Sequence, residues 1–307
     1  METWLPHFTD EVQRLLGYSP TTATAYASDI RRFLAYLAQQ GKAIPPASLS
    51  AEDVVGFLQH EAATGRSRAT VQRRTASLRV LERCLLMTHR IDKPFMPAEP
   101  LLEEALNQSR PPRLTACLQS EDLQRLWETL TASPKRQALR DLALMALLAE
   151  WGFPVRALLA LRLHHVDEAQ HRLWLPSLSG TMMPWELHGS FAPLARYMAQ
   201  GRAGLSPKAG ETHLFISQQG KPLSRQSVWH SLRQWGQRAG LELPLTPRVL
   251  RATAAHRMLA RGLPPKTIGL ALGHTNPLST SLLIRRLHTS CDKTPPAELP
   301  DLALPEN

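Results

Sequence analysis

A stretch dense in proline divides the chain into two parts. Five prolines fall between residues 94 and 112 of the 307-residue chain: Pro94, Pro97, Pro100, Pro111 and Pro112. Proline lacks a backbone N–H and its ring clashes with the preceding helical turn, so such a stretch does not continue a helix. We therefore predict domains at residues 1–105 and 114–290, a linker at 106–113 and a Pro-rich tail at 291–307.

The part before these prolines has the apolar spacing of helices. Ser19 and Pro20 form a cap and first-turn pair, after which apolar residues recur at helical spacing until Gly41. A second helix is predicted at 50–63, with acidic residues in its first turn, and a third after Gly65. The first domain is therefore predicted to be helical.

The second part is predicted to be mainly α-helical with a small antiparallel β element. Two short strand-like runs, at 172–175 and 184–187, are joined by the turn-forming residues 177–180 and suggest a hairpin. Helices are predicted at 120–132, 137–150, 224–239, 247–261, 264–272 and 279–287.

The positive charge is concentrated in the second part. The chain carries a formal charge of +10; residues 1–105 hold 12 Lys/Arg against 12 Asp/Glu, and residues 106–290 hold 23 against 10. Such a distribution favours a polyanionic partner, most often nucleic acid. A basic protein without such a partner remains the alternative from charge alone.

The cysteines and histidines give no indication of a metal or cofactor site. Cys84, Cys117 and Cys291 are far apart in sequence and fit no metal-ligand spacing, so we expect ordinary thiols of a reducing compartment. His164 and His165 are adjacent in sequence. Adjacent side chains point in different directions, so we do not expect this pair to share a metal ion. No signal peptide and no apolar run near the ~20 residues of a membrane span is found, so we expect a cytoplasmic protein.

Residues 246–262 have the signals of a helix that begins at an anion site. Thr246 is a cap, Pro247 suits the first helical position and Gly262 ends the pattern. Arg248 and Arg251 share a face of the opening turn, where the helix dipole and free amides attract a phosphate. A Gly273-His274 pair follows 22 residues after Arg251.

This segment resembles the signature of the tyrosine recombinases (phage integrase family, Xer-like), in which a His-x-x-Arg and a later Leu-Gly-His hold the scissile phosphate. Residues 223–230 are similar to the family's groove-binding helix, and residues 140–153 to the stretch that leads to its first catalytic arginine. Tyr26, Asp29 and Phe33 fit its core-binding domain. The resemblance covers about residues 10–288. It implies a helical, SAM-like core-binding domain followed by a recombinase catalytic-like domain.

Several positions depart from the family's catalytic pattern. The nucleophilic tyrosine corresponds to Leu283, and no tyrosine follows Tyr197. Pro154 occupies the position of the family's first catalytic arginine. Arg156 follows two residues later, and on a helix two residues correspond to a rotation of about 200°. Arg248 replaces the histidine, and no lysine lies between Lys135 and Lys208 to serve as the hairpin lysine.

Arg251 and His274 are the remaining matches to the catalytic set, and His274 could equally serve as a helix cap. Phosphoryl transfer needs positioned positive charge together with an activated nucleophile. Without the nucleophile no covalent intermediate forms by this route. We therefore predict a pseudo-enzyme without a cofactor.

DNA contacts are predicted from both domains. Arg225 and Gln226 follow the cap Ser224, where they suit guanine and adenine edges, although a solvated face is the alternative. The run from Arg66 to Arg90 holds seven arginines against Glu82 alone, which favours a polyanion that offsets the repulsion. Trp229 and Trp235 are expected to be packing residues. The predicted DNA-binding residues are Arg66, Arg68, Arg73, Arg74, Arg79, Arg225, Gln226, His230, Arg233, Arg248 and Arg251.

The resemblance implies a sequence-specific double-stranded DNA-binding protein. It would act as a non-catalytic partner in recombination or integration of a mobile element, or as a DNA-bound regulator. Its partners would be DNA and either an active recombinase or further copies of itself, on the bacterial nucleoid. One alternative is an active recombinase with a relocated nucleophile at Ser279, Thr280 or Ser281. A weaker one is a helix-turn-helix repressor that uses residues 264–287 alone.

Overall fold

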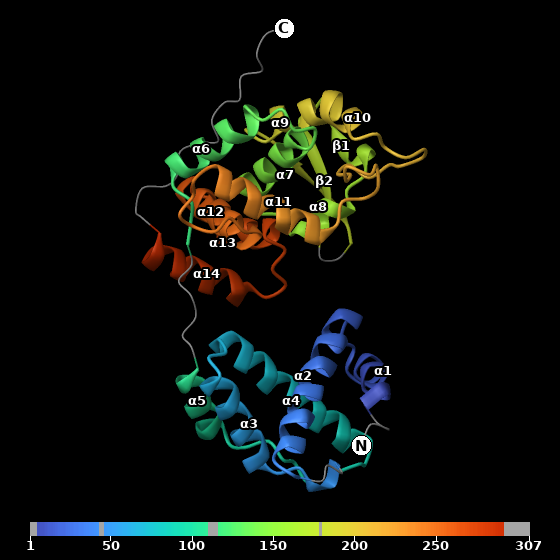
Figure 1. Ribbon diagram of the computed structural model, residues 1–307, viewed down its shortest axis with the longest axis vertical. Coiled ribbons are helices and arrows are strands. Elements are labelled where there is room, and N and C mark those ends of the chain that lie inside the picture. The colour runs from blue at the N-terminus through green and yellow to red at the C-terminus, as the bar shows by residue number, and fades with distance from the viewer. Residues whose placement is uncertain (1–4, 43–45, 110–115, 178–179, 292–307) are drawn as a thin grey trace. The chain divides into compact units, whose positions relative to one another are not determined.

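The computed structural model describes residues 5–42, 46–109, 116–177 and 180–291 (Figure 1). It divides the chain into two compact units, Met1–Arg113 and Leu114–Asn307, called here the N-terminal and C-terminal units. The described part is mainly helical with one small antiparallel sheet, so the predicted fold class is confirmed.

The N-terminal unit is a helical bundle around its own apolar core. Ser19, Ser50 and Ser67 each accept a hydrogen bond from a backbone N–H in the first turn of the helix that follows, which is why three of these helices begin where they do. The core includes Phe33 and Phe57, whose ring centroids lie 5.2 Å apart. The helices are α1 (Leu5–Leu16), α2 (Pro20–Gln39), α3 (Ala51–Ala63), α4 (Arg68–Met87) and α5 (Glu99–Gln108).

Helix α5 lies inside the proline-dense stretch. Pro100 stands in its first turn, where a missing N–H leaves no hydrogen bond unmade. Leu102 and Ala105 are buried in the core of the N-terminal unit. Residues 106–108 are therefore helical, and the predicted linker at 106–113 begins too early. Residues 110–115 lie outside the described residues, as does the tail from 292.

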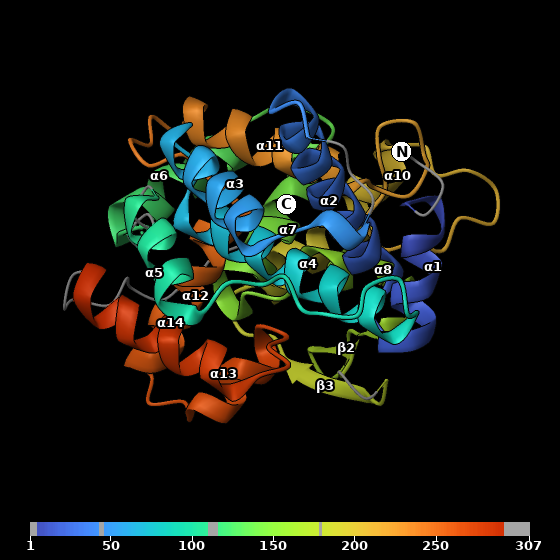
Figure 2. The same ribbon diagram turned by 90° about the horizontal axis from the view of Figure 1, so that it is seen from below.

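The C-terminal unit is built around α7, which is buried along nearly its whole length. Helix α12 packs along α7, and other helices and the sheet surround this pair (Figures 1 and 2). The helices are α6 (Ser120–Thr131), α7 (Ala138–Trp151), α8 (Val155–Ala160), α9 (Phe191–Arg196), α10 (Arg202–Gly204), α11 (Arg225–Arg238), α12 (Pro247–Ala260), α13 (Pro265–Ala271) and α14 (Pro277–Ser290).

The predicted hairpin is present as part of a three-stranded antiparallel sheet. Strands β2 (Arg172–Pro176) and β3 (Met182–Glu186) pair with Leu173 opposite Trp185. A two-residue strand, β1 (Val166–Asp167), extends the sheet in the order β1-β2-β3. The sequence did not predict β1, because two residues are too few to show a period.

The cysteines do not all behave as the sequence suggested. Cys117 and Cys291 form a disulfide across a sequence separation of 174 residues, so the expectation of ordinary thiols is wrong for this pair. Sequence spacing could not reveal the bond because the fold alone brings the two segments together. Cys84 is a free thiol buried in the N-terminal unit, and burial raises its pKa.

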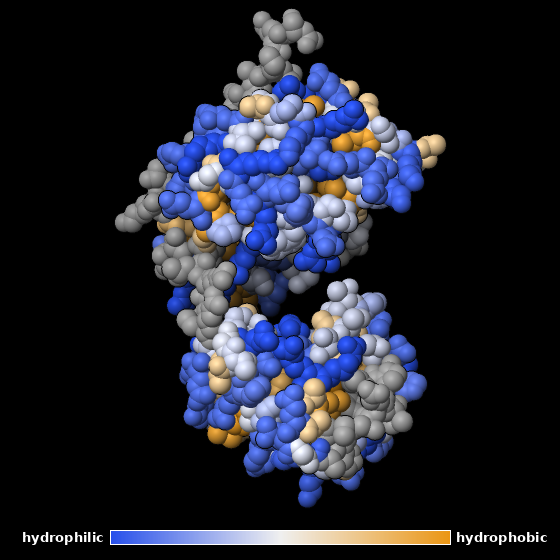
Figure 3. All heavy atoms as spheres, viewed as in Figure 1, coloured by the Kyte–Doolittle hydropathy of each residue, from blue (hydrophilic) through white to orange (hydrophobic). Residues whose placement is uncertain are grey.

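The surface is mostly hydrophilic, and Figure 3 shows this on one face of each unit. Helix α14 is an exception, because Leu278 is 67% exposed and Leu282 is 52% exposed. Across the ranges that the structure describes, every helix is too short or too polar to cross a membrane.

Candidate nucleic-acid interface

A cavity in the C-terminal unit brings together the positions singled out by the resemblance. Its volume is 720 Å³, and it is lined by residues of α8, α11, α12 and α14 and of the turn after α13. The lining residues are Pro154, Val155, Arg156, Arg225, Trp229, Pro247, Arg248, Arg251, Ala252, Leu272, Gly273, His274, Ser279, Leu282, Leu283 and Arg286. Pro154 and Arg286, which are 132 residues apart in sequence, thus meet at one site.

The cavity is strongly cationic. Its lining includes the five arginines Arg156, Arg225, Arg248, Arg251 and Arg286, and none of the described residues that line it is acidic. Guanidinium groups present planar forks of N–H donors that match phosphate oxygens. The site is therefore suited to a phosphate or another multiply charged oxyanion.

The N-terminus of α12 adds the positive end of its helix dipole to the cavity. Thr246 Oγ1 accepts a hydrogen bond of 3.2 Å from the Val249 N–H, and Pro247 occupies the first turn, as predicted. Arg251 is half-buried, and its Nη2 donates to the Leu272 carbonyl oxygen at 2.5 Å. Burial lowers the pKa of Arg251, yet guanidinium stays charged at neutral pH. Arg251 is thus a fixed positive charge at a helix N-terminus.

The Gly273-His274 pair ends α13 with a Schellman motif. The Gly273 N–H donates to the Leu270 carbonyl at 3.0 Å and the His274 N–H to the Gly269 carbonyl at 2.9 Å, with Gly273 at φ +63°. The His274 ring makes a 2.9 Å hydrogen bond through Nδ1 to Thr280 Oγ1. Burial, and secondarily Arg251, lower the pKa of His274, which keeps the ring neutral at pH 7.

Pro154 and Arg156 both line the cavity, although Arg156 was expected to point away from it. Pro154 precedes the first helical residue of α8 with an extended ψ of 130°, and a Cβ added at Gly273 would meet its Cγ at 2.7 Å. Arg156 was expected to point away by a helical rotation of about 200°. It lines the same cavity as Pro154, because Pro154 lies outside the helix and the rotation does not apply. This arginine was missed as a site residue.

Leu283, which the resemblance aligns with the family's tyrosine, lines the cavity with its side chain half-buried. Tyr197 is fully buried, donates its hydroxyl to the Leu214 carbonyl at 2.9 Å, and has its pKa raised to about 12, mainly by burial. Among the hydroxyls near Leu283, Ser279 lines the cavity and Thr280 is only 3% exposed.

Helix α11 presents a polar face that continues from the cavity. Ser224 Oγ accepts a hydrogen bond of 3.0 Å from the Ser227 N–H, which starts the helix. The exposed residues of this face are Arg225, Gln226, Trp229, His230 and Arg233. Trp229 is 41% exposed and lines the cavity, so its expected packing role is wrong. Trp235 is buried and donates to Asp141 at 2.8 Å, as a packing residue should.

Several arginines of α4, and Arg66 just before it, are paired with acidic side chains of other helices. Arg66 pairs with Glu61 at 3.5 Å, Arg73 with Asp29, and Arg79 with Glu99 at 2.5 Å. The inference that these arginines need a polyanion to offset their mutual repulsion is therefore wrong. It counted the acidic residues of one stretch of sequence and not those of the helices packed against it. Arg66, Arg73 and Arg79 nevertheless remain exposed, and Arg68 is half-exposed.

Arg74 was predicted to bind DNA, and the structure contradicts this prediction. It is 5% exposed and pairs with Glu61 and with Asp29, the latter at 3.7 Å. A buried guanidinium held by two carboxylates cannot reach a phosphate on the surface. Burial raises the pKa of Asp29, while Arg73 and Arg74 act against this rise. Arg74 is therefore part of the interior of the N-terminal unit.

Two family models match the chain. The phage integrase family model matches residues 116–286, and the model of the phage integrase N-terminal SAM-like domain matches residues 5–88. The first match lies within the C-terminal unit and the second within the N-terminal unit.

Curated relatives match over nearly their whole length. The chain is 29% identical over 294 residues to tyrosine recombinase XerC of Herpetosiphon aurantiacus, covering 95% of this chain and 91% of the relative. It is 26% identical over 281 residues to tyrosine recombinase XerD of Halalkalibacterium halodurans, covering 90% and 89%.

Solved structures share the fold. A lambda integrase dimer bound to a COC' core site matches with a TM-score of 0.68 at 17% identity, covering 96% of this chain and 79% of that one. The XerH site-specific recombinase bound to palindromic difH substrate matches with a TM-score of 0.68 at 16% identity, covering 88% and 76%.

Proposed function

Because the chain belongs to the phage integrase family, we propose that it binds a specific site on duplex DNA through the arginine-lined cavity and α11 without cutting the DNA. The observation that carries this proposal is Leu283. Its side chain lines the cavity. The resemblance aligns it with the family's nucleophilic tyrosine, and a leucine has no group that can attack phosphorus.

The arginines support phosphate binding. Arg156, Arg248 and Arg251 come from the starts of two helices and line one cavity with no acidic neighbour among its described lining residues. Contacts of this kind fix a protein on the DNA backbone and carry no sequence information. Sequence reading is assigned to the neighbouring exposed face of α11, where Arg225 and Gln226 can reach base edges.

The role in the cell follows from binding without cleavage. The protein acts as a non-catalytic partner in recombination or integration of a mobile element, or as a regulator bound at its site. The related lambda integrase structure is a dimer on DNA, which supports an assembly that contains a second copy of this chain or an active recombinase.

An active recombinase with a relocated nucleophile is the second candidate. Ser279 lines the cavity, and Arg156 supplies a positive charge next to Pro154. Against it, His274 Nδ1 is hydrogen-bonded to Thr280 Oγ1, and none of the hydrogen bonds among the described residues joins the His274 ring to the Ser279 hydroxyl. A serine hydroxyl without an adjacent base is a weak nucleophile.

The test begins with the target site. Sequences that the full chain retains from a random duplex pool are sequenced, and the site is then offered on supercoiled DNA. We expect a selected consensus and no nicked product, with an added active Xer-type recombinase as the positive control. Absence of any consensus would contradict specific binding, and nicking by this chain alone would contradict the non-catalytic role.

A further inference from the structure

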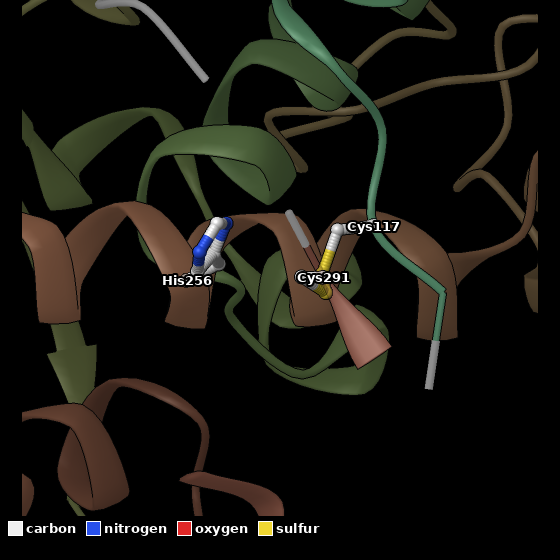
Figure 4. A group of neighbouring side chains, drawn as sticks. All are labelled: Cys117, His256 and Cys291. Atoms are coloured by element: carbon white, nitrogen blue, oxygen red, sulfur yellow. A yellow bond between two sulfur atoms is a disulfide. The ribbon is translucent and has the colours of Figure 1, made fainter. Parts of the chain in front are cut away.

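Two cysteines and a histidine meet on the C-terminal unit away from the arginine-lined cavity. Cys117 lies just before α6, His256 lies on α12, and Cys291 ends α14 (Figure 4). The two sulfur atoms and a ring nitrogen of His256 all lie within 4.8 Å of one another. Three separate segments therefore contribute one donor atom each to one place.

One ring nitrogen of His256 has no hydrogen-bond partner among the described residues. This atom, Nδ1, is also buried. A buried polar atom without a partner costs free energy, so such atoms call for an explanation. Once the disulfide is reduced, a metal ion between the two sulfurs and the ring would give this nitrogen a partner.

The backbone around these residues is held in place. The Leu118 N–H donates to Thr253 Oγ1 at 2.9 Å, which fixes the residue after Cys117 to α12 one turn before His256. The Cys291 N–H donates to the Leu287 carbonyl at 3.0 Å at the end of α14. Neither contact involves the sulfur atoms, and α14 packs on α12 with Leu287 buried in the core of the same unit. We therefore expect the three donors to stay close together after the disulfide is reduced.

We propose that the reduced protein binds one Zn²⁺ ion through Cys117, His256 and Cys291. Thiolate and imidazole are the preferred zinc ligands, and tetrahedral Zn–S bonds of about 2.3 Å place two sulfurs about 3.8 Å apart. The Cα atoms of the two cysteines are 6.0 Å apart, which permits that separation by side-chain rotation. His288 lies in the last turn of α14, three residues before Cys291, and is not one of the three donors that lie within 4.8 Å of one another.

The disulfide and the zinc site are alternative states of the same residues. A dithiol reductant gives two electrons and two protons to the Cys117–Cys291 bond and leaves as its own cyclic disulfide. Zn²⁺ then displaces one proton from each thiol as it binds. Each state ties the end of α14 to the start of the unit, so each holds the cavity wall that carries Leu283 and Arg286.

The first experiment uses Co²⁺ as a coloured substitute for Zn²⁺. The full chain is reduced with a dithiol, desalted without oxygen and titrated with Co²⁺, with absorption from thiolate-to-cobalt charge transfer as the readout. We expect one equivalent to give this absorption and Zn²⁺ to displace it. The oxidised chain should give none. A reduced chain without thiolate-to-cobalt absorption would overturn the proposal.

Single substitutions of Cys117, Cys291 and His256 test whether each of these residues is a zinc ligand. Cys117→Ser and Cys291→Ser are each expected to weaken Zn²⁺ binding by about a hundredfold or more, because changes to groups behind the ligands already cost up to about a hundredfold. His256→Phe should weaken it by at least about tenfold. Cys84→Ser is the matched control, since Cys84 is buried in the other unit, and should bind as the unchanged chain does. Equal binding by all four variants would contradict the assignment.

A second measurement needs no substitution. The reduced, unchanged chain is treated with iodoacetamide with and without Zn²⁺, and modified cysteines are mapped by mass spectrometry. Zinc is expected to slow alkylation of Cys117 and Cys291 by about tenfold or more. The same rates with and without zinc would overturn the proposal even if the serine variants fail to fold.

Discussion

Arg251 Nη2 lies 2.5 Å from the carbonyl oxygen of Leu272, the residue that precedes Gly273 and His274. This hydrogen bond joins the start of α12 to the end of α13 and fixes the guanidinium at the cavity. The two parts of the recombinase signature are thus connected by a contact that needs no DNA. The cavity is therefore largely formed before a phosphate enters.

Arg251→Ala is expected to weaken binding of the selected duplex by about tenfold or more, since a hydrogen bond to a charged group contributes about 1.5–3 kcal/mol. The slope of log affinity against log salt should fall by about one. Titrations at several salt concentrations measure both quantities. Arg261→Ala is the matched control, because Arg261 is exposed at the other end of α12 and outside the cavity lining. Equal effects of both substitutions would contradict a phosphate role for Arg251.

Substitutions on α11 should change sequence preference. Arg225→Ala and Gln226→Ala are each expected to relax discrimination by about 1–3 kcal/mol at one or two base pairs. Arg68→Ala should instead weaken all duplexes alike, because a phosphate contact is independent of sequence. Binding to a panel of single-base variants of the site measures the difference. If Arg68→Ala and Arg225→Ala give the same profile, α11 is not the reading helix.

The correction at Arg74 leads to a prediction about stability. Arg74→Ala leaves the buried carboxylates of Glu61 and Asp29 with less compensation, and losing one partner of a buried pair costs about 3–5 kcal/mol. Arg79→Ala removes an exposed pair and should cost about 1 kcal/mol or less. Urea unfolding followed by circular dichroism compares the two variants. A stable Arg74→Ala variant with reduced DNA affinity would restore the original assignment.

Much of the fold could be predicted from local signals. The caps Ser19 and Thr246 and the apolar spacing after them place α2 and α12 within about a residue of their observed bounds. The motif positions Pro154, Arg248 and Leu283 were predicted from a resemblance, and the structure places all three on one cavity. Order along the chain was enough here because Pro154 and Arg248 lie at the starts of helices and Leu283 lies within a third helix.

The features that were missed depend on contacts between distant segments. Helix α5 was hidden because proline is read as a breaker, although Pro100 occupies a first turn that tolerates it. Neither the burial of Arg74 beside Glu61 nor the Cys117–Cys291 bond leaves a periodic signal in the sequence. Arg156 was set aside because helical rotation was applied across Pro154, which lies before the helix.

Restoring the nucleophile alone should not restore cleavage. Leu283→Tyr supplies the hydroxyl, but Pro154 and Arg248 remain at the positions that the resemblance assigns to the family's arginine and histidine. Loss of one preorganised donor can cost about a hundredfold to a thousandfold in rate. We expect detectable cleavage of the selected site only when Leu283→Tyr is combined with Pro154→Arg and Arg248→His. Efficient cleavage by the single variant would show that Arg156 already fills the arginine role.

The most direct test of the non-catalytic account is covalent capture by the unchanged chain. The protein is incubated with its selected site carrying a break that traps any protein–DNA bond, denatured, and examined by intact mass, with an active Xer-type recombinase on its own trapped site as the positive control. The account predicts the mass of the free chain alone, because Leu283 offers no nucleophile and Tyr197 is buried. A mass increased by the DNA fragment, mapped to Ser279 or any other residue, would contradict it and establish an active recombinase.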